Sequence, residues 1–196
     1  MKGNKNTFTI LSCTALVILA VISRIINSET HWYGFAPVVA ISLFSGAIMK
    51  NKTYAYLLPL AAYLLSDIFL GLFTDTQGFY GISQFFVYGA MALVVLLGTQ
   101  MRQPKALRIL GFTLGGSAIF WIVSNLGVFA GGFYGYSFEG FITTYLMAIP
   151  FYTPMGSSMF INAFVGDLLF SGLLFGAYAL LSQSAAAGAW RLAAKK

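Results

Sequence analysis

Long apolar runs, separated by short polar or basic segments, dominate the chain from end to end. They lie at about 7–26, 35–49, 54–73, 82–101, 107–129 and 159–181. Most reach the roughly 20 residues that an α-helix needs to cross the hydrocarbon core of a bilayer. A shorter apolar stretch, 141–151, ends at a proline and is interpreted as an interfacial or re-entrant segment. The pattern predicts an all-α membrane protein, a bundle of six transmembrane helices.

Composition supports lipid as the solvent of this chain. Of 196 residues, 8% are charged and 59% are apolar, and the mean hydropathy is +0.82. A soluble domain carries about a quarter charged residues, so these charges are too few to cover a water-exposed surface. The net charge of +6 is spread in pairs and triplets rather than in one polar segment, so no nucleic-acid partner is expected. With one cysteine and one histidine, Cys13 and His31, neither a metal site nor a cofactor is expected.

The distribution of basic residues predicts the orientation. With the N-terminus inside, ten of the eleven basic residues fall on the cytoplasmic side: Lys2, Lys5, Lys50, Lys52, Arg102, Lys105, Arg108, Arg191, Lys195 and Lys196. Arg24 alone falls on the outer side, at the end of the first span. Because cytoplasmic loops carry an excess of Lys and Arg, both termini are predicted to be cytoplasmic. We divide the chain into a transmembrane domain, 1–183, and a basic, alanine-rich tail, 184–196.

Two carboxylates fall inside predicted spans, Asp67 and Asp167, and neither has a Lys or Arg within its own span. A carboxylate at the bilayer centre costs about 2.5–3.5 kcal/mol on insertion scales, so each must face the bundle interior, a water-filled cavity or polar groups of another helix. They are candidates for solute, ion or proton binding; the alternative is a structural tie between helices. Asn125 and Asn162 lie in spans as well and carry the same two interpretations.

The predicted outer loops are rich in aromatic residues that alternate with glycine. The candidates for solute contact are Trp32, Tyr33, Tyr134, Tyr136, Glu139 and Tyr145. Aromatic residues at a membrane interface are ordinarily anchors. Glycines, however, let a loop fold tightly and approach a ligand, and aromatic faces stack on flat molecules. Both interpretations stay open.

Small residues four positions apart indicate faces on which helices pack closely in lipid. Such pairs are Ser42 with Gly46, Gly111 with Gly115, and Gly172 with Gly176. They predict close contacts, either within the bundle or with a partner subunit.

An ordered set of short motifs resembles a group of uncharacterised bacterial six-helix membrane proteins. The motifs are the stretch from Gly34 to Ala47, Leu58-Pro59-Leu60-Ala61-Ala62 with Ser66-Asp67, Ser124-Asn125-Leu126-Gly127-Val128 and Ile149-Pro150-Phe151. In size, helix count and topology that group is similar to the substrate-binding S components of energy-coupling-factor (ECF) vitamin transporters. The resemblance implies a bacterial cytoplasmic membrane protein that binds a vitamin under its outer loops, with a coupling protein and ATPases as partners. The Ala-xxx-Ala pair common in the first span of S components is not present here, since Ala15 and Ala20 are five apart.

The leading hypothesis is therefore a membrane protein that captures a small organic micronutrient from outside, such as a cobalamin-type or other ring-containing molecule. The chain has no Gly-x-x-x-x-Gly-Lys-Ser/Thr loop, so energy would come from a partner or from the solute gradient. An intramembrane enzyme using Asp67 and Asp167 as a carboxylate pair is a weaker hypothesis, and we expect no enzyme. A non-transporting scaffold or assembly subunit is the other alternative.

Overall fold

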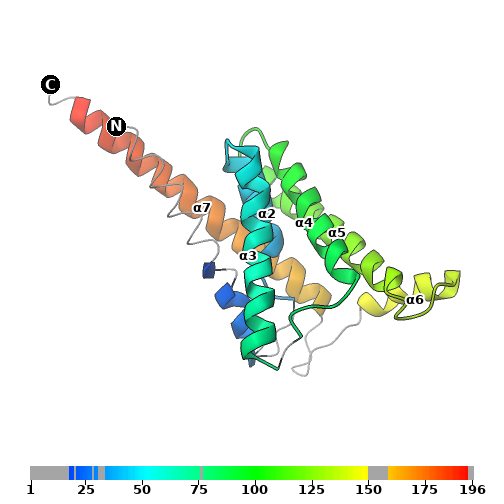
Figure 1. Cartoon of the computed structure of the whole chain (residues 1–196). Coiled ribbons are helices and arrows are strands. Elements are labelled where there is room, and N and C mark those ends of the chain that lie inside the picture. The colour runs from blue at the N-terminus through cyan, green and yellow to red at the C-terminus, as the bar shows by residue number, and fades with distance from the viewer. Residues whose placement is uncertain are drawn as a thin grey trace.

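The computed structural model describes residues 18–19, 21–27, 29–30, 34–75, 77–149 and 159–193, with side chains up to residue 182. Within these ranges the chain is helical and has no strand (Figure 1). A first helical stretch covers 21–27, with 18–19 and 29–30 also helical. The helices that follow are α2 (Val38–Ile48), α3 (Lys52–Phe73), α4 (Ser83–Thr99), α5 (Ala106–Ala130), α6 (Phe138–Ala148) and α7 (Met159–Ala193).

Three stretches of helix are long and apolar enough to cross a bilayer: α3, α5 and residues 160–182 of α7. Helices α2 and α4 are apolar but shorter. The described part of the chain thus has the character of a membrane protein. The 11 residues of α2 extend about 16 Å at 1.5 Å per residue, about half of a bilayer's hydrocarbon core. The count of six spans and the orientation stay predictions.

Helix α2 is the centre of the bundle. It packs against α3, α4, α5 and α7, and residues 39–46 are all buried. The apolar core forms around it: Val39, Leu43 and Phe44 belong to one buried cluster with Val94 of α4 and Phe175 of α7. Figure 1 shows α2 behind α3, with α4 and α5 on one side and α7 crossing the bundle. A helix that is apolar on all faces is a buried one, and α2 fits that rule.

Glycines set how closely α2 and α4 approach each other. A Cβ atom at Gly46 would overlap the carbonyl oxygen of Val95, and one at Gly98 would overlap that of Leu43. The two backbones therefore touch where both helices carry glycine, which confirms the close contact that the Ser42–Gly46 spacing predicts. A Cβ atom at Gly111, Gly172 or Gly176 would meet nothing within 4 Å, so those three glycines make no close contact with the described residues of the bundle.

Local signals in the sequence explain where α3 and α6 begin. The side chain of Asn51 accepts hydrogen bonds from the N–H groups of Thr53 and Tyr54 at the start of α3, at 2.9 and 3.4 Å. Ser137 does the same for Gly140 at the start of α6, at 3.1 Å. Asn and Ser are preferred at this position because their oxygens satisfy N–H groups that have no partner in the first turn.

From residue 35 on, the helix boundaries follow the predicted spans closely, with two differences at the C-terminal end. Residues 7–17 of the first predicted span lie outside the described residues. The short stretch predicted at 141–151 is a helix, α6, that begins three residues earlier and packs against α5. Helix α7 continues through the predicted domain boundary at residue 183, and its C-terminal part extends past the other helices (Figure 1). Alanine has the highest helix propensity, which explains why the helix continues through this alanine-rich segment.

Candidate functional site

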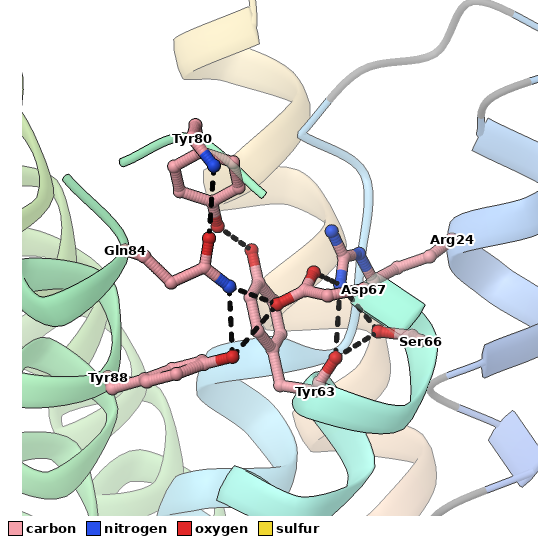
Figure 2. A network of polar contacts seen from close by, with 7 residues as sticks. All are labelled: Arg24, Tyr63, Ser66, Asp67, Tyr80, Gln84 and Tyr88. Atoms are coloured by element: carbon pink, nitrogen blue, oxygen red, sulfur yellow. Dashed lines mark hydrogen bonds and ion pairs between the residues drawn. The ribbon is translucent and has the colours of Figure 1, made fainter. Parts of the chain in front are cut away.

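Asp67 is the centre of a buried polar network between the first helical stretch, α3 and α4 (Figure 2). Its side chain is fully buried and forms an ion pair with Arg24 through Oδ1. The other oxygen, Oδ2, accepts hydrogen bonds from the amide of Gln84 and from the hydroxyl of Tyr88, the latter at 3.1 Å. Both carboxylate oxygens are thus satisfied, and the charge is balanced by an arginine 43 residues away.

Arg24 makes further contacts with α3 besides its ion pair with Asp67. Its Nη1 also donates to the hydroxyl of Ser66 and to the carbonyl of Tyr63, the latter at 3.4 Å. Its guanidinium lies 4.0 Å from the centre of the Tyr63 ring, a cation–π arrangement. Arg24 is the one basic residue on the predicted outer side. This exception to the charge pattern is the signal from which its pairing role could have been predicted.

Two tyrosines and a glutamine extend the network toward the loop between α3 and α4. The hydroxyls of Tyr63 and Tyr80 are 2.9 Å apart, and the Tyr80 N–H donates to the Gln84 side chain at 3.3 Å. Burial raises the pKa of Tyr80, so its hydroxyl stays neutral and acts as an ordinary hydrogen-bond partner. Sequence analysis did not include these tyrosines, although Tyr63 lies four residues before Asp67 and helical residues four apart are neighbours.

The space beside this network is small. A cavity of about 10 Å³ lies between Arg24, Tyr63, Pro37, Pro59 and Met91. A single water needs about 10–15 Å³, whereas pockets for small organic ligands measure about 300–1,000 Å³. The Asp67 network is therefore arranged as a structural tie with room for about one water.

Asp167 lies in a second polar cluster, where α7 meets α5 and α2. It is 4% exposed, and the hydroxyl of Ser117 donates to its Oδ2 at 2.6 Å. The backbone N–H of Val39, in the first turn of α2, also donates to its carboxylate. First-turn N–H groups have no partner within their own helix, so Asp167 serves as an N-terminal cap supplied by a distant helix.

Two glycines allow close packing next to Ser117 and Asp167. A Cβ atom at Gly116 would lie 3.1 Å from Val39, and one at Gly166 would lie 3.2 Å from Phe35. Each glycine directly precedes a residue of the cluster, Ser117 or Asp167. Asp67 and Asp167 share no hydrogen-bond partner among the described residues, so they form two separate sites and not one carboxylate pair.

A third feature is an aromatic cluster between α5, α6 and the start of α7, centred on Trp121. The rings of Tyr145 and Phe160 lie 5.5 and 5.6 Å from the Trp121 ring, centre to centre. Tyr145 in turn contacts Phe141 at 5.1 Å. These distances are typical of edge-to-face aromatic packing.

The indole nitrogen of Trp121 gives this apolar cluster a polar group. Its Nε1 atom is buried and finds no hydrogen-bond acceptor among the described residues. A buried donor left without an acceptor costs about 1–3 kcal/mol. In contrast, the hydroxyl of Tyr145 donates to the carbonyl of Ile122 at 2.8 Å. The side-chain amide of Asn125 donates to the backbone carbonyl of Trp121 at 2.7 Å.

The structure brings some of the predicted solute-contacting residues together and separates others. Asn125 and Tyr145 belong to the Trp121 cluster, and the half-buried Asn162 lies on α7 two residues after Phe160. Tyr136 and Glu139 are exposed and Tyr134 is half-buried, all near the start of α6. Trp32 and Tyr33 lie outside the described residues. Trp121 and Phe160 escaped sequence analysis because a tryptophan or phenylalanine inside an apolar span has no local signal of a polar need.

In the loop between α5 and α6, two glycines allow the backbone to turn. Gly132 and Gly135 adopt φ angles of +74° and +80°, a conformation that residues with a side chain rarely adopt. The exposed Tyr136 packs its ring against Phe129 of α5, 6.3 Å between centres. These contacts fit the interpretation of the loop aromatics as anchors at an interface.

Comparison with known proteins gives the chain a family but no characterised relative. Searches of curated proteins and of solved structures returned no match. The profile of a family of unknown function, DUF6580, matches residues 4–189. That range covers all the helices described above except the last four residues of α7. The chain therefore belongs to the DUF6580 family.

Proposed function

We propose that this protein binds a small, ring-containing organic solute in the bacterial cytoplasmic membrane. The observation that carries the proposal is the buried N–H of Trp121, which has no acceptor among the described residues and lies within an aromatic cluster of three helices. Aromatic faces bind flat rings, and a few placed polar groups fix a ligand's orientation. The ligand class is then a planar or ring-containing molecule with a hydrogen-bond acceptor at its edge.

The position of the cluster supports capture from the outer side. Trp121 lies nine residues before the end of α5, about 14 Å at 1.5 Å per residue. That end of α5 leads into the Gly-aromatic loop, which the charge pattern predicts to be outside. Together with six predicted spans and two cytoplasmic termini, this arrangement supports the proposed similarity to ECF S components. A vitamin-like solute and an ECF-type coupling protein with its ATPases belong to the same proposal.

We propose no catalysis. The two intramembrane carboxylates have separate partners, Arg24 for Asp67 and Ser117 for Asp167, whereas a carboxylate pair that shares a proton must lie close together. A scaffold role is the second candidate. The specific observation in its favour is that Gly111, Gly172 and Gly176 are exposed and open, so another chain's helix has room to pack on them.

The test is a measurement of bound solute with a variant that removes one donor. Protein purified in mild detergent is analysed by mass spectrometry for co-purified small molecules and by thermal shift with a panel of water-soluble vitamins. For the ligand so identified, we expect W121F to keep the ring packing and lose about 3–10-fold in affinity, the effect of one hydrogen bond of about 0.5–1.5 kcal/mol.

The matched control is F85L, which removes an aromatic ring that is 75% exposed on α4, away from the cluster. Its affinity should equal that of the unmodified protein. A ligand that binds W121F and the unmodified protein equally well would show that Trp121 is not part of the site. Absence of any ligand across several growth media and the whole panel would shift support to the scaffold role.

A further inference from the structure

Among the described residues, only neutral groups hold Asp167. The hydroxyl of Ser117 and the backbone N–H of Val39 donate to it, and no Lys or Arg in the described part of the chain pairs with it. Asp67, the other intramembrane carboxylate, has Arg24 as its ion-pair partner. Within the described part of the chain, Asp167 thus has no counterpart of the arginine that balances Asp67.

Two opposed effects act on this carboxyl group. Burial away from water disfavours its charged form, and such a group commonly neutralises instead. The Ser117 hydroxyl and the N-terminus of α2 favour the charged form, because hydrogen-bond donors and the positive end of a helix stabilise an anion. A carboxyl group balanced in this way is suited to bind and release a positive charge.

The close packing around Asp167 favours a proton over a metal ion. A single added methyl carbon at Gly116 or Gly166 would already lie 3.1 or 3.2 Å from its neighbour, closer than ordinary van der Waals contact. A metal ion would need space and several oxygen ligands within this packing. A proton adds almost no volume.

Two hydroxyl groups provide hydrogen-bonding positions one helical turn away. Thr113 and Ser171 are 0% and 1% exposed, and their hydroxyl oxygens have no hydrogen-bond partner among the described residues. Thr113 lies four residues before Ser117, and Ser171 lies four residues after Asp167, so each shares a helix face with its cluster residue. Because α5 and α7 pack together and run in opposite directions (Figure 1), both hydroxyls lie on the same side of the cluster.

Among the side chains that the structure describes on these three helices, no other titratable group competes for the role. Arg108 is exposed at the start of α5, and Tyr178 of α7 packs its ring on Phe44 at 5.9 Å, far along the helix from Asp167. Helix α2 carries no titratable residue.

We propose that Asp167 is a proton-binding site at the junction of α2, α5 and α7, with the hydroxyls of Thr113 and Ser171 as the adjacent hydrogen-bonding positions. Proton uptake removes the negative charge from the N-terminus of α2, which links the site to the central helix of the bundle. The inference does not rest on solute binding at Trp121.

The experiment is infrared difference spectroscopy of the whole protein in detergent or lipid, titrated with pH. We expect the spectrum of the unmodified protein minus that of D167N to contain the carbonyl stretching band of one protonated carboxylic acid, which disappears as the pH rises. The subtraction removes the bands of the other four carboxylic side chains, which both proteins share. The matched control is the double variant R24M/D67N, which removes the other intramembrane carboxylate together with its ion-pair partner and should leave the band in place. A second variant, S117A, removes a donor that stabilises the anion, so the band should persist to higher pH than in the unmodified protein.

Two results would overturn the proposal: no titrating band in this difference spectrum, or a band there that Na⁺ abolishes when it replaces choline at constant pH. The last would show a metal cation at the site. If D167N does not fold, S117A decides the matter, because an unchanged titration there excludes Asp167 as the proton site.

Discussion

At the residue scale, the molecule deals with its two intramembrane carboxylates in different ways. Asp67 receives an arginine, an amide and a hydroxyl, whereas Asp167 receives a hydroxyl and the N-terminus of a helix. The first arrangement balances a full charge and ties three segments together. In the second arrangement, the negative charge of Asp167 is stabilised by the partial charges of a hydroxyl group and a helix N-terminus.

Losing one partner of the Arg24–Asp67 pair should be strongly destabilising. Replacing both partners should cost much less. Removing one partner of a buried pair typically costs about 3–5 kcal/mol, because the other charge stays buried and unpaired. We therefore expect R24M and D67N each to lower the free energy of unfolding by roughly this amount. Denaturant or thermal unfolding in detergent measures it.

The double variant R24M/D67N provides the control. It leaves no uncompensated charge, so its loss should be clearly smaller than the sum of the two single losses. Strict additivity of the two effects would contradict the ion pair.

At the element scale, α2 is a short buried helix with a charged side chain from another segment at each end. Asp167 accepts from the Val39 N–H in its first turn. The ammonium group of Lys52 donates to the carbonyls of Gly46 and Met49 at its last turn, at 3.2 and 3.3 Å. An anion at the N-terminus and a cation at the C-terminus both complement the helix dipole. These contacts give hydrogen-bond partners to backbone groups at both ends of a helix of only 11 residues.

The crossing of α2 and α4 depends on glycine. In G46A the new methyl group would overlap the backbone of Val95, which cannot move as a flexible side chain can. We expect a loss of about 1–3 kcal/mol in unfolding free energy, the usual effect of overpacking.

The matched control is G89A on α4, where a Cβ atom meets nothing within 4 Å. Alanine favours helix over glycine by up to about 1 kcal/mol, so this variant should be neutral or more stable. Equal destabilisation by both substitutions would mean that the crossing does not depend on Gly46.

At the scale of the whole molecule, orientation in the membrane comes from the charge pattern. The loops at the two ends of α4, around Asp75 and Gln103, are exposed and are separated by a helix of 17 residues, about 25 Å. Basic residues flank Gln103 on both sides and are lacking around Asp75. The loop with the basic residues is predicted to be cytoplasmic.

Cysteine labelling tests this orientation directly. With Cys13 replaced by serine, D75C should react with a membrane-impermeant maleimide in intact cells. Q103C should react only after the cells are opened. Labelling of Q103C from outside would reverse the topology and would place the Trp121 cluster toward the cytoplasmic side.

The amino-acid sequence by itself determined the character of this protein and most of its helix boundaries. The long apolar runs and the scarcity of charge require lipid, and Asn51 and Ser137 mark helix starts, because these signals act within a few neighbouring residues. The sequence also identified Asp67 and Asp167 as residues that need partners.

Only the tertiary structure determined which residues are the partners of Asp67 and Asp167. Arg24 lies 43 residues from Asp67, and Ser117 lies 50 residues from Asp167. The unpaired indole of Trp121 likewise becomes visible only when α5, α6 and α7 are packed together. Such contacts depend on which helices meet and at what register, and apolar spans of similar composition carry little local information about either.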